Sequence, residues 1–107
     1  KNGLYKVAFQ TPLGAGSGVA FLQDGKIRGG DSTIYYTGTY QQNGDQFTAA
    51  VLSAKHTDIS GMNSVFGVDR ANIELTGKST DHSATCQGKS PEAPGVPFSA
   101  ELSRIGD

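Results

Sequence analysis

Apolar and polar residues alternate over short segments of this chain, which is the period of β-strands with one buried face. In one such segment Tyr5, Val7 and Phe9 fall on the same face. A second segment, residues 33–40, is almost entirely β-branched or aromatic. Alternation and β-branched or aromatic composition together predict about eight short strands. They cover residues 4–10, 19–23, 26–30, 33–40, 47–54, 70–76, 82–87 and 98–103.

Turn residues separate these segments. Asp24-Gly25 and Asn43-Gly44 each lie between two apolar runs, the strongest short-range signal for a β-hairpin. The glycine-rich residues 11–18 predict a loop. Successive hairpins favour an antiparallel meander, and closure into a barrel would remove its exposed edges. We therefore expect one all-β domain over residues 1–107, an up-and-down antiparallel barrel, with an open two-layer sheet as the alternative.

Two segments interrupt the strand pattern. Gly29-Gly30-Asp31 predicts a bulge or tight turn in which Asp31 accepts hydrogen bonds from backbone amides, and a binding role for Asp31 is the alternative. Residues 56–67 carry apolar side chains that either plug a barrel end or form a short helical turn. Those side chains are Ile59, Met62, Val65 and Phe66.

Composition narrows the classes of partner. The 107 residues include 9 Lys and Arg against 10 Asp and Glu, for a formal charge of -1, with no basic cluster that would favour nucleic acid. Charged and polar residues interrupt every apolar run well short of a membrane span. The single cysteine, Cys86, rules out an internal disulfide and favours the cytoplasm.

The residues that could carry chemistry form no recognisable constellation. His82 and Cys86 are four positions apart on a predicted strand, roughly 13 Å, too far to hold one metal ion together. Residues 14–18 are similar to a phosphate-binding loop, but a strand and not a helix follows them. We therefore expect no enzyme activity, cofactor or metal.

The predicted interior offers a site for a small apolar ligand. Small residues at Ala71, Ala84 and Ala100 would leave space beside larger side chains, as in barrels that hold one ligand. The candidate ligand-binding residues are aromatic: Tyr5, Phe9, Phe21, Tyr36 and Phe98.

The first half of the chain resembles the GrlR-like family of negative regulators of type III secretion. The resemblance lies in Asn2-Gly3-Leu4-Tyr5, Phe9, Gly16-Ser17-Gly18-Val19, Asp24-Gly25-Lys26-Ile27, Gly29-Gly30-Asp31, Tyr36, Gly38 and Tyr40. It implies a lipocalin-like barrel of eight strands that forms a homodimer, and regulatory members of the family sequester a transcriptional activator. Those members have an acidic hairpin loop, which falls here at residues 41–46, where only Asp45 is charged.

Two functions follow as expectations. The resemblance and the absent catalytic constellation favour a non-enzymatic regulator that binds a protein partner. The alternative is a carrier of a small apolar ligand in the barrel interior.

Overall fold

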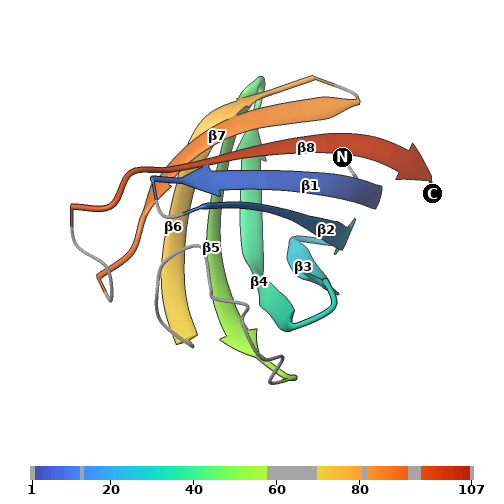
Figure 1. Ribbon diagram of the computed structural model, residues 1–107. Helices are drawn as coiled ribbons and strands as arrows, with labels where there is room; N and C mark the ends of the chain where they lie inside the picture. Colours follow the sequence, from blue (N-terminus) through green and yellow to red (C-terminus); the bar gives the residue numbers. More distant parts are fainter. Residues whose placement is uncertain (1, 13, 58–69, 81, 92–94, 107) are drawn as a thin grey trace.

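Eight antiparallel strands form a closed barrel in the computed structural model, which describes residues 2–12, 14–57, 70–80, 82–91 and 95–106 (Figure 1). Within those residues every regular element is a strand, so the predicted all-β, up-and-down antiparallel barrel is confirmed. The strands are β1 (Gly3–Thr11), β2 (Gly14–Gln23), β3 (Lys26–Gly30), β4 (Ile34–Asn43), β5 (Gln46–Lys55), β6 (Arg70–Ser79), β7 (Ser83–Lys89) and β8 (Phe98–Gly106).

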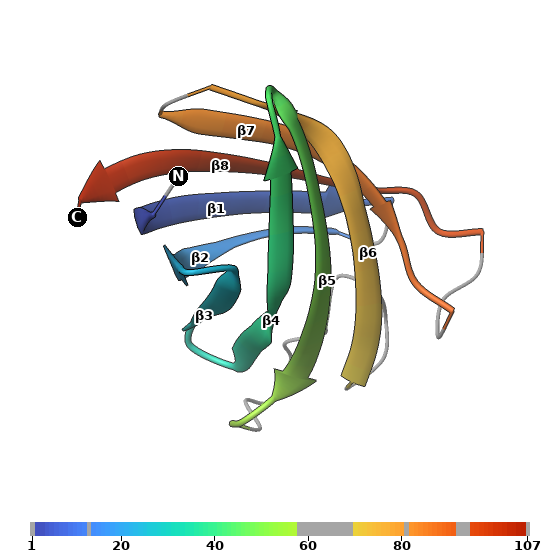
Figure 2. The same ribbon diagram turned by 180° about the vertical axis from the view of Figure 1, so that it is seen from behind.

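Each strand pairs with the next in sequence, and β1 pairs with β8 to close the barrel. At this seam Val7 lies opposite Leu102 and Phe9 opposite Ala100, so apolar residues from the two strands meet inside. Figures 1 and 2 show β1, β2, β7 and β8 crossing over β4, β5 and β6. The core is formed by buried and partly buried residues from all eight strands, and Tyr36 and Tyr40 of β4 are among the partly buried ones.

Of the two predicted hairpin turns, one forms at the expected residues and the other is shifted by one residue. Asp24 and Gly25 have φ values of 53° and 81°, the two left-handed positions of a type I′ turn, as predicted. At the β4–β5 hairpin Asn43 pairs with Gln46, so the two-residue loop is Gly44-Asp45, one position later than the predicted Asn43-Gly44. Gly44, the first residue of this loop, has a left-handed φ of 62°, which is a position where two-residue hairpin loops favour glycine.

The loop predicted over residues 11–18 is wrong, because residues 14–18 belong to β2 and pair regularly with β1. Gly16 and Gly18 face the interior, where neighbouring rings occupy the space that side chains would fill. A Cβ on Gly16 would lie 2.6 Å from Cε2 of Phe9, and one on Gly18 would lie 2.9 Å from the hydroxyl of Tyr36. Aromatic rings that cover glycines stabilise a strand whose own residues have low β-propensity.

The bulge predicted at Gly29-Gly30 is also wrong. Both glycines lie in the regular ladder between β2 and β3, opposite Ala20 and Val19, and neither has a positive φ. A Cβ at Gly29 would collide with the carbonyl oxygen of Val19. These positions therefore require glycine because two backbones approach closely and not because the chain turns there.

The core contains the small residues that were predicted to face inward. Ala71, Ala84 and Ala100 are all buried. The predicted plug of Ile59, Met62, Val65 and Phe66 lies outside the described residues. The part of the chain that the structure describes contains no helix long and apolar enough to cross a membrane.

Candidate functional site

An apolar cavity lies inside the barrel, and its walls come from inward-facing residues of every strand except β7. The cavity has a volume of about 60 Å³. Its lining is Val7, Phe9, Ala20, Ile27, Ile34, Tyr36, Phe47, Val51, Ser53, Ile73, Leu75, Phe98, Ala100 and Leu102. Only Tyr36 and Ser53 in this lining have polar side-chain atoms, so the cavity suits a neutral, mostly hydrocarbon molecule.

Three of the five predicted ligand-binding residues meet at this cavity. The Phe9 and Tyr36 rings form an edge-to-face pair with centroids 5.9 Å apart, and Phe9 stacks on Phe98 at 6.3 Å. Both distances are typical of favourable aromatic pairs. Tyr5 is buried in the same core but does not line the cavity.

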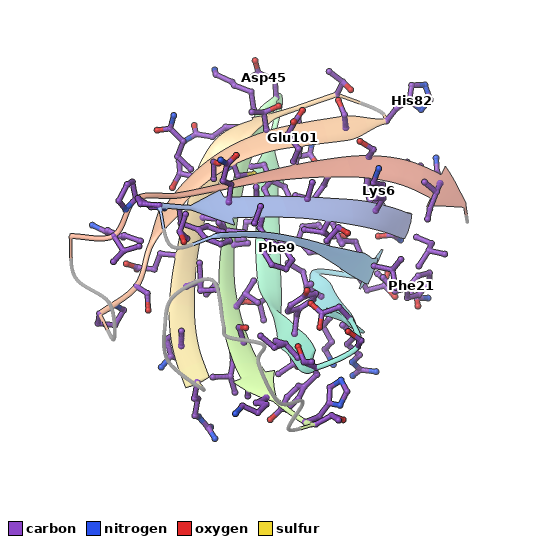
Figure 3. All side chains as sticks on the ribbon, viewed as in Figure 1. Lys6, Phe9, Phe21, Asp45, His82 and Glu101 are labelled. Atoms are coloured by element: carbon purple, nitrogen blue, oxygen red, sulfur yellow. The ribbon has the colours of Figure 1, made fainter. Side chains whose placement is uncertain are left out.

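The predicted inward position of Phe21 is wrong. Its neighbours Ala20 and Leu22 are buried, and because side chains alternate along a strand, Phe21 points to the outer side of β2. Figure 3 shows Phe21 at the margin of the barrel, apart from Phe9. The apolar run 19–22 did not alternate, so the sequence alone left its orientation open.

Asp31 organises the connection between β3 and β4. Its Oδ1 accepts hydrogen bonds from the amides of Thr33 (2.9 Å) and Ile34 (2.8 Å), as the sequence predicted, and Oδ2 accepts one from the Tyr36 hydroxyl at 2.8 Å. Burial disfavours the charged carboxylate, but these hydrogen bonds and one from the Thr33 hydroxyl outweigh it, so the pKa of Asp31 lies below its usual value. Burial and the neighbouring Asp31 charge raise the pKa of Tyr36 well above its ordinary range.

Tightly packed aromatic side chains occupy the end of the barrel near the β2–β3 and β4–β5 turns. Tyr40 stacks on the buried Phe47 with ring centroids 5.7 Å apart. The Asn2 side-chain oxygen accepts hydrogen bonds from the Tyr40 hydroxyl (2.9 Å) and from the amide of Asp24 (3.2 Å). These contacts tie Asn2, the residue before β1, to β4 and to the β2–β3 turn at this end.

Cys86 and the two histidines, the residues that could act as nucleophile and base, are separated from one another. Cys86 is 1% exposed, and burial raises the pKa of its thiol to about 11. His82 is exposed beside the β6–β7 turn, one residue before the start of β7, where the sequence had placed it in a strand. His56 is exposed at the opposite end, where its Nε2 lies 3.0 Å from the carbonyl oxygen of Asp31.

A second surface combines apolar and cationic side chains on the outside of β1, β2, β3 and β4. Its apolar members are Val19, Phe21 and Tyr35, which are 44%, 37% and 38% exposed. Its charged members are Lys6, Lys26 and Arg28, all exposed. We call these six residues the outer face; sequence analysis missed it because Phe21 was assigned to the interior.

Comparison of the chain with protein-family models and with curated protein sequences gave no match. Across the described residues, no group of three or more His, Cys, Asp or Glu side chains is arranged to hold a metal ion. What the chain does is therefore inferred from the cavity and the outer face.

Proposed function

We propose that this barrel is a non-catalytic regulatory protein that acts by binding a protein partner through its outer face. The observation that carries the proposal is the gathering of Val19, Phe21 and Tyr35 on one side of the barrel, each more than a third exposed. Grouped exposed apolar side chains on a strand surface mark interaction sites more often than isolated ones do. The same strands contain the residues that resemble the GrlR-like family, which agrees with the proposal.

The strand register makes these apolar side chains neighbours. Phe21 lies directly opposite Leu4 on β1, and Val19 lies opposite Gly30 on β3. Gly30 in turn lies opposite Tyr35 on β4. Because Gly30 has no side chain, no side chain of β3 separates Val19 from Tyr35 across these three strands.

The positions of the reactive groups support a non-catalytic role. The only thiol, Cys86, is buried and has a raised pKa, which disfavours the thiolate that acts as a nucleophile. The Asp31 carboxylate is engaged by three neighbouring residues of its own connection and strand. His56 and His82 lie at opposite ends of the barrel, so they do not form one site.

The test is affinity capture from an extract of the source cell, with the wild-type chain and variants as bait. We expect the wild type to retain a protein that Phe21→Ser and Val19→Ser do not retain. Gln87→Ser, at an exposed position on β7, is the control and should retain it as the wild type does. Titration of the purified partner against the same four chains would then give the loss in affinity, about 5- to 30-fold for Phe21→Ser if it is a hot spot. Retention that is indifferent to both outer-face substitutions would overturn the proposal.

The cavity favours a second candidate, binding of a compact neutral molecule inside the barrel. One water needs a cavity of about 10–15 Å³, so a cavity of about 60 Å³ has room for roughly four to six heavy atoms. A long acyl chain would not fit without expansion of the barrel. The aromatic lining at Phe9, Tyr36 and Phe98 instead suits a small planar or branched molecule.

Titration with benzene, followed by the NMR signals of the core methyl groups, tests this candidate. We expect saturable shifts at Val51 and Leu102, which line the cavity, and weaker binding by Ala100→Val, which fills part of it. Ala84→Val is the matched control, since Ala84 is buried but does not line the cavity. Equal shifts throughout the protein, or none, would remove the candidate.

A further inference from the structure

We infer that the partner segment recognised by the outer face is acidic and carries at least one large apolar side chain; this inference rests on the proposed function. Strands β1 to β4 contain three charged residues, and all three are cations: Lys6, Lys26 and Arg28. All are exposed, and the register with β2 places them on the same side of the sheet as Phe21 and Val19. A partner that covers the apolar side chains must therefore also meet these positive charges.

The register places a cation directly beside Val19 and another beside Phe21, the two outer-face residues of β2. Arg28 lies opposite Phe21, and Lys6 lies opposite Val19. Directly opposite residues on neighbouring strands have side chains close enough to act on the same ligand group. An apolar partner side chain seated on Phe21 would therefore bring the residues that flank it within reach of Arg28.

A surface depression beside Phe21 repeats this combination. It is lined by Phe21, Gln23, Asp24, Lys26 and Arg28. Phe21 offers an apolar wall, whereas Lys26 and Arg28 offer two cationic groups against the single carboxylate of Asp24. The balance of charge in the depression favours a carboxylate-bearing segment over a basic one.

The cations of the outer face are available for a partner. Within the described part of the chain the structure records no ion pair for Lys6, Lys26 or Arg28. Lys78 on β6, in contrast, lies 3.5 Å from the carboxylate of Asp45. An acidic partner would thus supply counter-charges without breaking ion pairs of the barrel itself, and electrostatic attraction would speed its association.

Two other occupants fit the outer face less well. A second copy docked face to face would bring Lys6, Lys26 and Arg28 against the same cations of its neighbour, because a two-fold interface pairs a surface with itself. A single nucleic acid strand would gain stacking on Phe21 and Tyr35, but only three cations would meet its phosphates, and the chain as a whole has a charge of -1. Both are outcomes of the experiment below.

The absence of tryptophan in this chain permits a direct binding measurement. The probe is a glutamate-rich peptide with one tryptophan, whose fluorescence anisotropy reports binding to the full chain without interference from protein tryptophan. We expect saturable binding that weakens with added salt, and at least tenfold weaker binding of the peptide in which every glutamate is glutamine. Equal affinity for the glutamate and glutamine peptides would overturn the inference.

Substitutions locate the binding. We expect Arg28→Gln and Lys6→Gln each to lower the affinity for the glutamate peptide by about two- to fivefold, and Phe21→Ser to lower it further. Lys89→Gln on β7 should leave this affinity unchanged. Phe21→Tyr retains a ring and should restore most of the affinity. If Lys89→Gln weakens binding as much as Arg28→Gln, the peptide does not use the outer face and the inference fails.

Two competing probes complete the test. Tighter binding of single-stranded oligothymidine than of the glutamate peptide would assign the outer face to nucleic acid. Concentration-dependent dimerisation that Phe21→Ser abolishes would assign it to a second copy. Either result overturns the inference. The proposed function is overturned separately, by partner capture that is indifferent to both Phe21→Ser and Val19→Ser, or by assignment of the outer face to nucleic acid.

Discussion

The Tyr36 hydroxyl donates a hydrogen bond to the Asp31 carboxylate over 2.8 Å, which ties the inner side of β4 to the connection that precedes the strand. The same hydroxyl lies where a side chain at Gly18 of β2 would have to stand. Tyr36 of β4 therefore contacts both the β3–β4 connection and β2, and it also forms part of the cavity wall. Two predictions concern this arrangement directly.

Asp31→Asn should destabilise the barrel by about 1 kcal/mol, because an amide accepts the hydrogen bonds of Thr33, Ile34 and Tyr36 less well than a partly exposed carboxylate does. The folded-state pKa lies below the usual 3.8, so this stabilisation is present above pH 3.8 and is lost as the pH falls through the lower, folded value. Urea unfolding at several pH values measures it. The free-energy difference between wild type and variant should shrink in acid, and a constant difference would contradict the prediction.

Gly18→Ala should destabilise the barrel by about 1–3 kcal/mol, the usual cost of overpacking. The added Cβ would lie 2.7 Å from the carbonyl oxygen of Gly30 and 2.9 Å from the Tyr36 hydroxyl, and the backbone atom cannot move aside freely. Ser17→Ala, at an exposed position next to it, is the control and should change stability little. Chemical denaturation followed by circular dichroism compares the two variants; equal effects would show that the close approach at Gly18 is relaxed in solution.

Cys86 should resist alkylation in the folded protein. Its thiol is 1% exposed and has a pKa raised to about 11, so little thiolate forms near neutral pH and reagents reach it poorly. Mass spectrometry after treatment with iodoacetamide at pH 8 should find the native chain almost unmodified and the guanidinium-unfolded chain fully modified. Rapid modification of the native chain would mean that β7 opens readily.

Gly25→Ala should destabilise the β2–β3 hairpin by about 1 kcal/mol, because Gly25 has a left-handed φ of 81° that disfavours a side chain. Gly25→Asn, which tolerates this conformation better, should recover part of the loss. Thermal unfolding of the three chains provides the measurement. The ranking Gly, then Asn, then Ala is the expected order, and the reverse order for the two variants would contradict the type I′ assignment.

Much of this fold could be predicted from local signals. Alternation in β1 and β6, and the Asp24-Gly25 turn, act over a few residues and therefore leave a clear trace in the sequence. The glycines at residues 14–18 predicted a loop where the structure has a strand. That strand is supported by the Phe9 and Tyr36 rings, which cover Gly16 and Gly18 from other strands. Such contacts between distant residues cannot be recovered from local propensity.

The candidate sites were predictable only in part. Phe9 and Phe98 fell on strands with clean alternation, and Tyr36 lies two residues after Ile34 on the same face of its strand, so their common orientation toward the cavity could be expected. Phe21 sits in an unbroken apolar run, and only the ladder with β1 and β3 fixes its side. Counting back from the Asp24-Gly25 turn would have placed Phe21 opposite Arg28, and this signal could have revealed the outer face. Homodimer formation and the cytoplasmic location stay predictions.

The seam between β1 and β8 has a consequence for how the barrel forms. Every other ladder joins consecutive strands, whereas this one joins segments from opposite ends of the described chain. Closing so long a loop carries the largest entropic cost of any pairing here, so hairpins should assemble first and the seam last. Slow folding, with amide protons of β1 and β8 acquiring protection after those of β4 and β5, is the kinetic signature of a barrel that closes in this order.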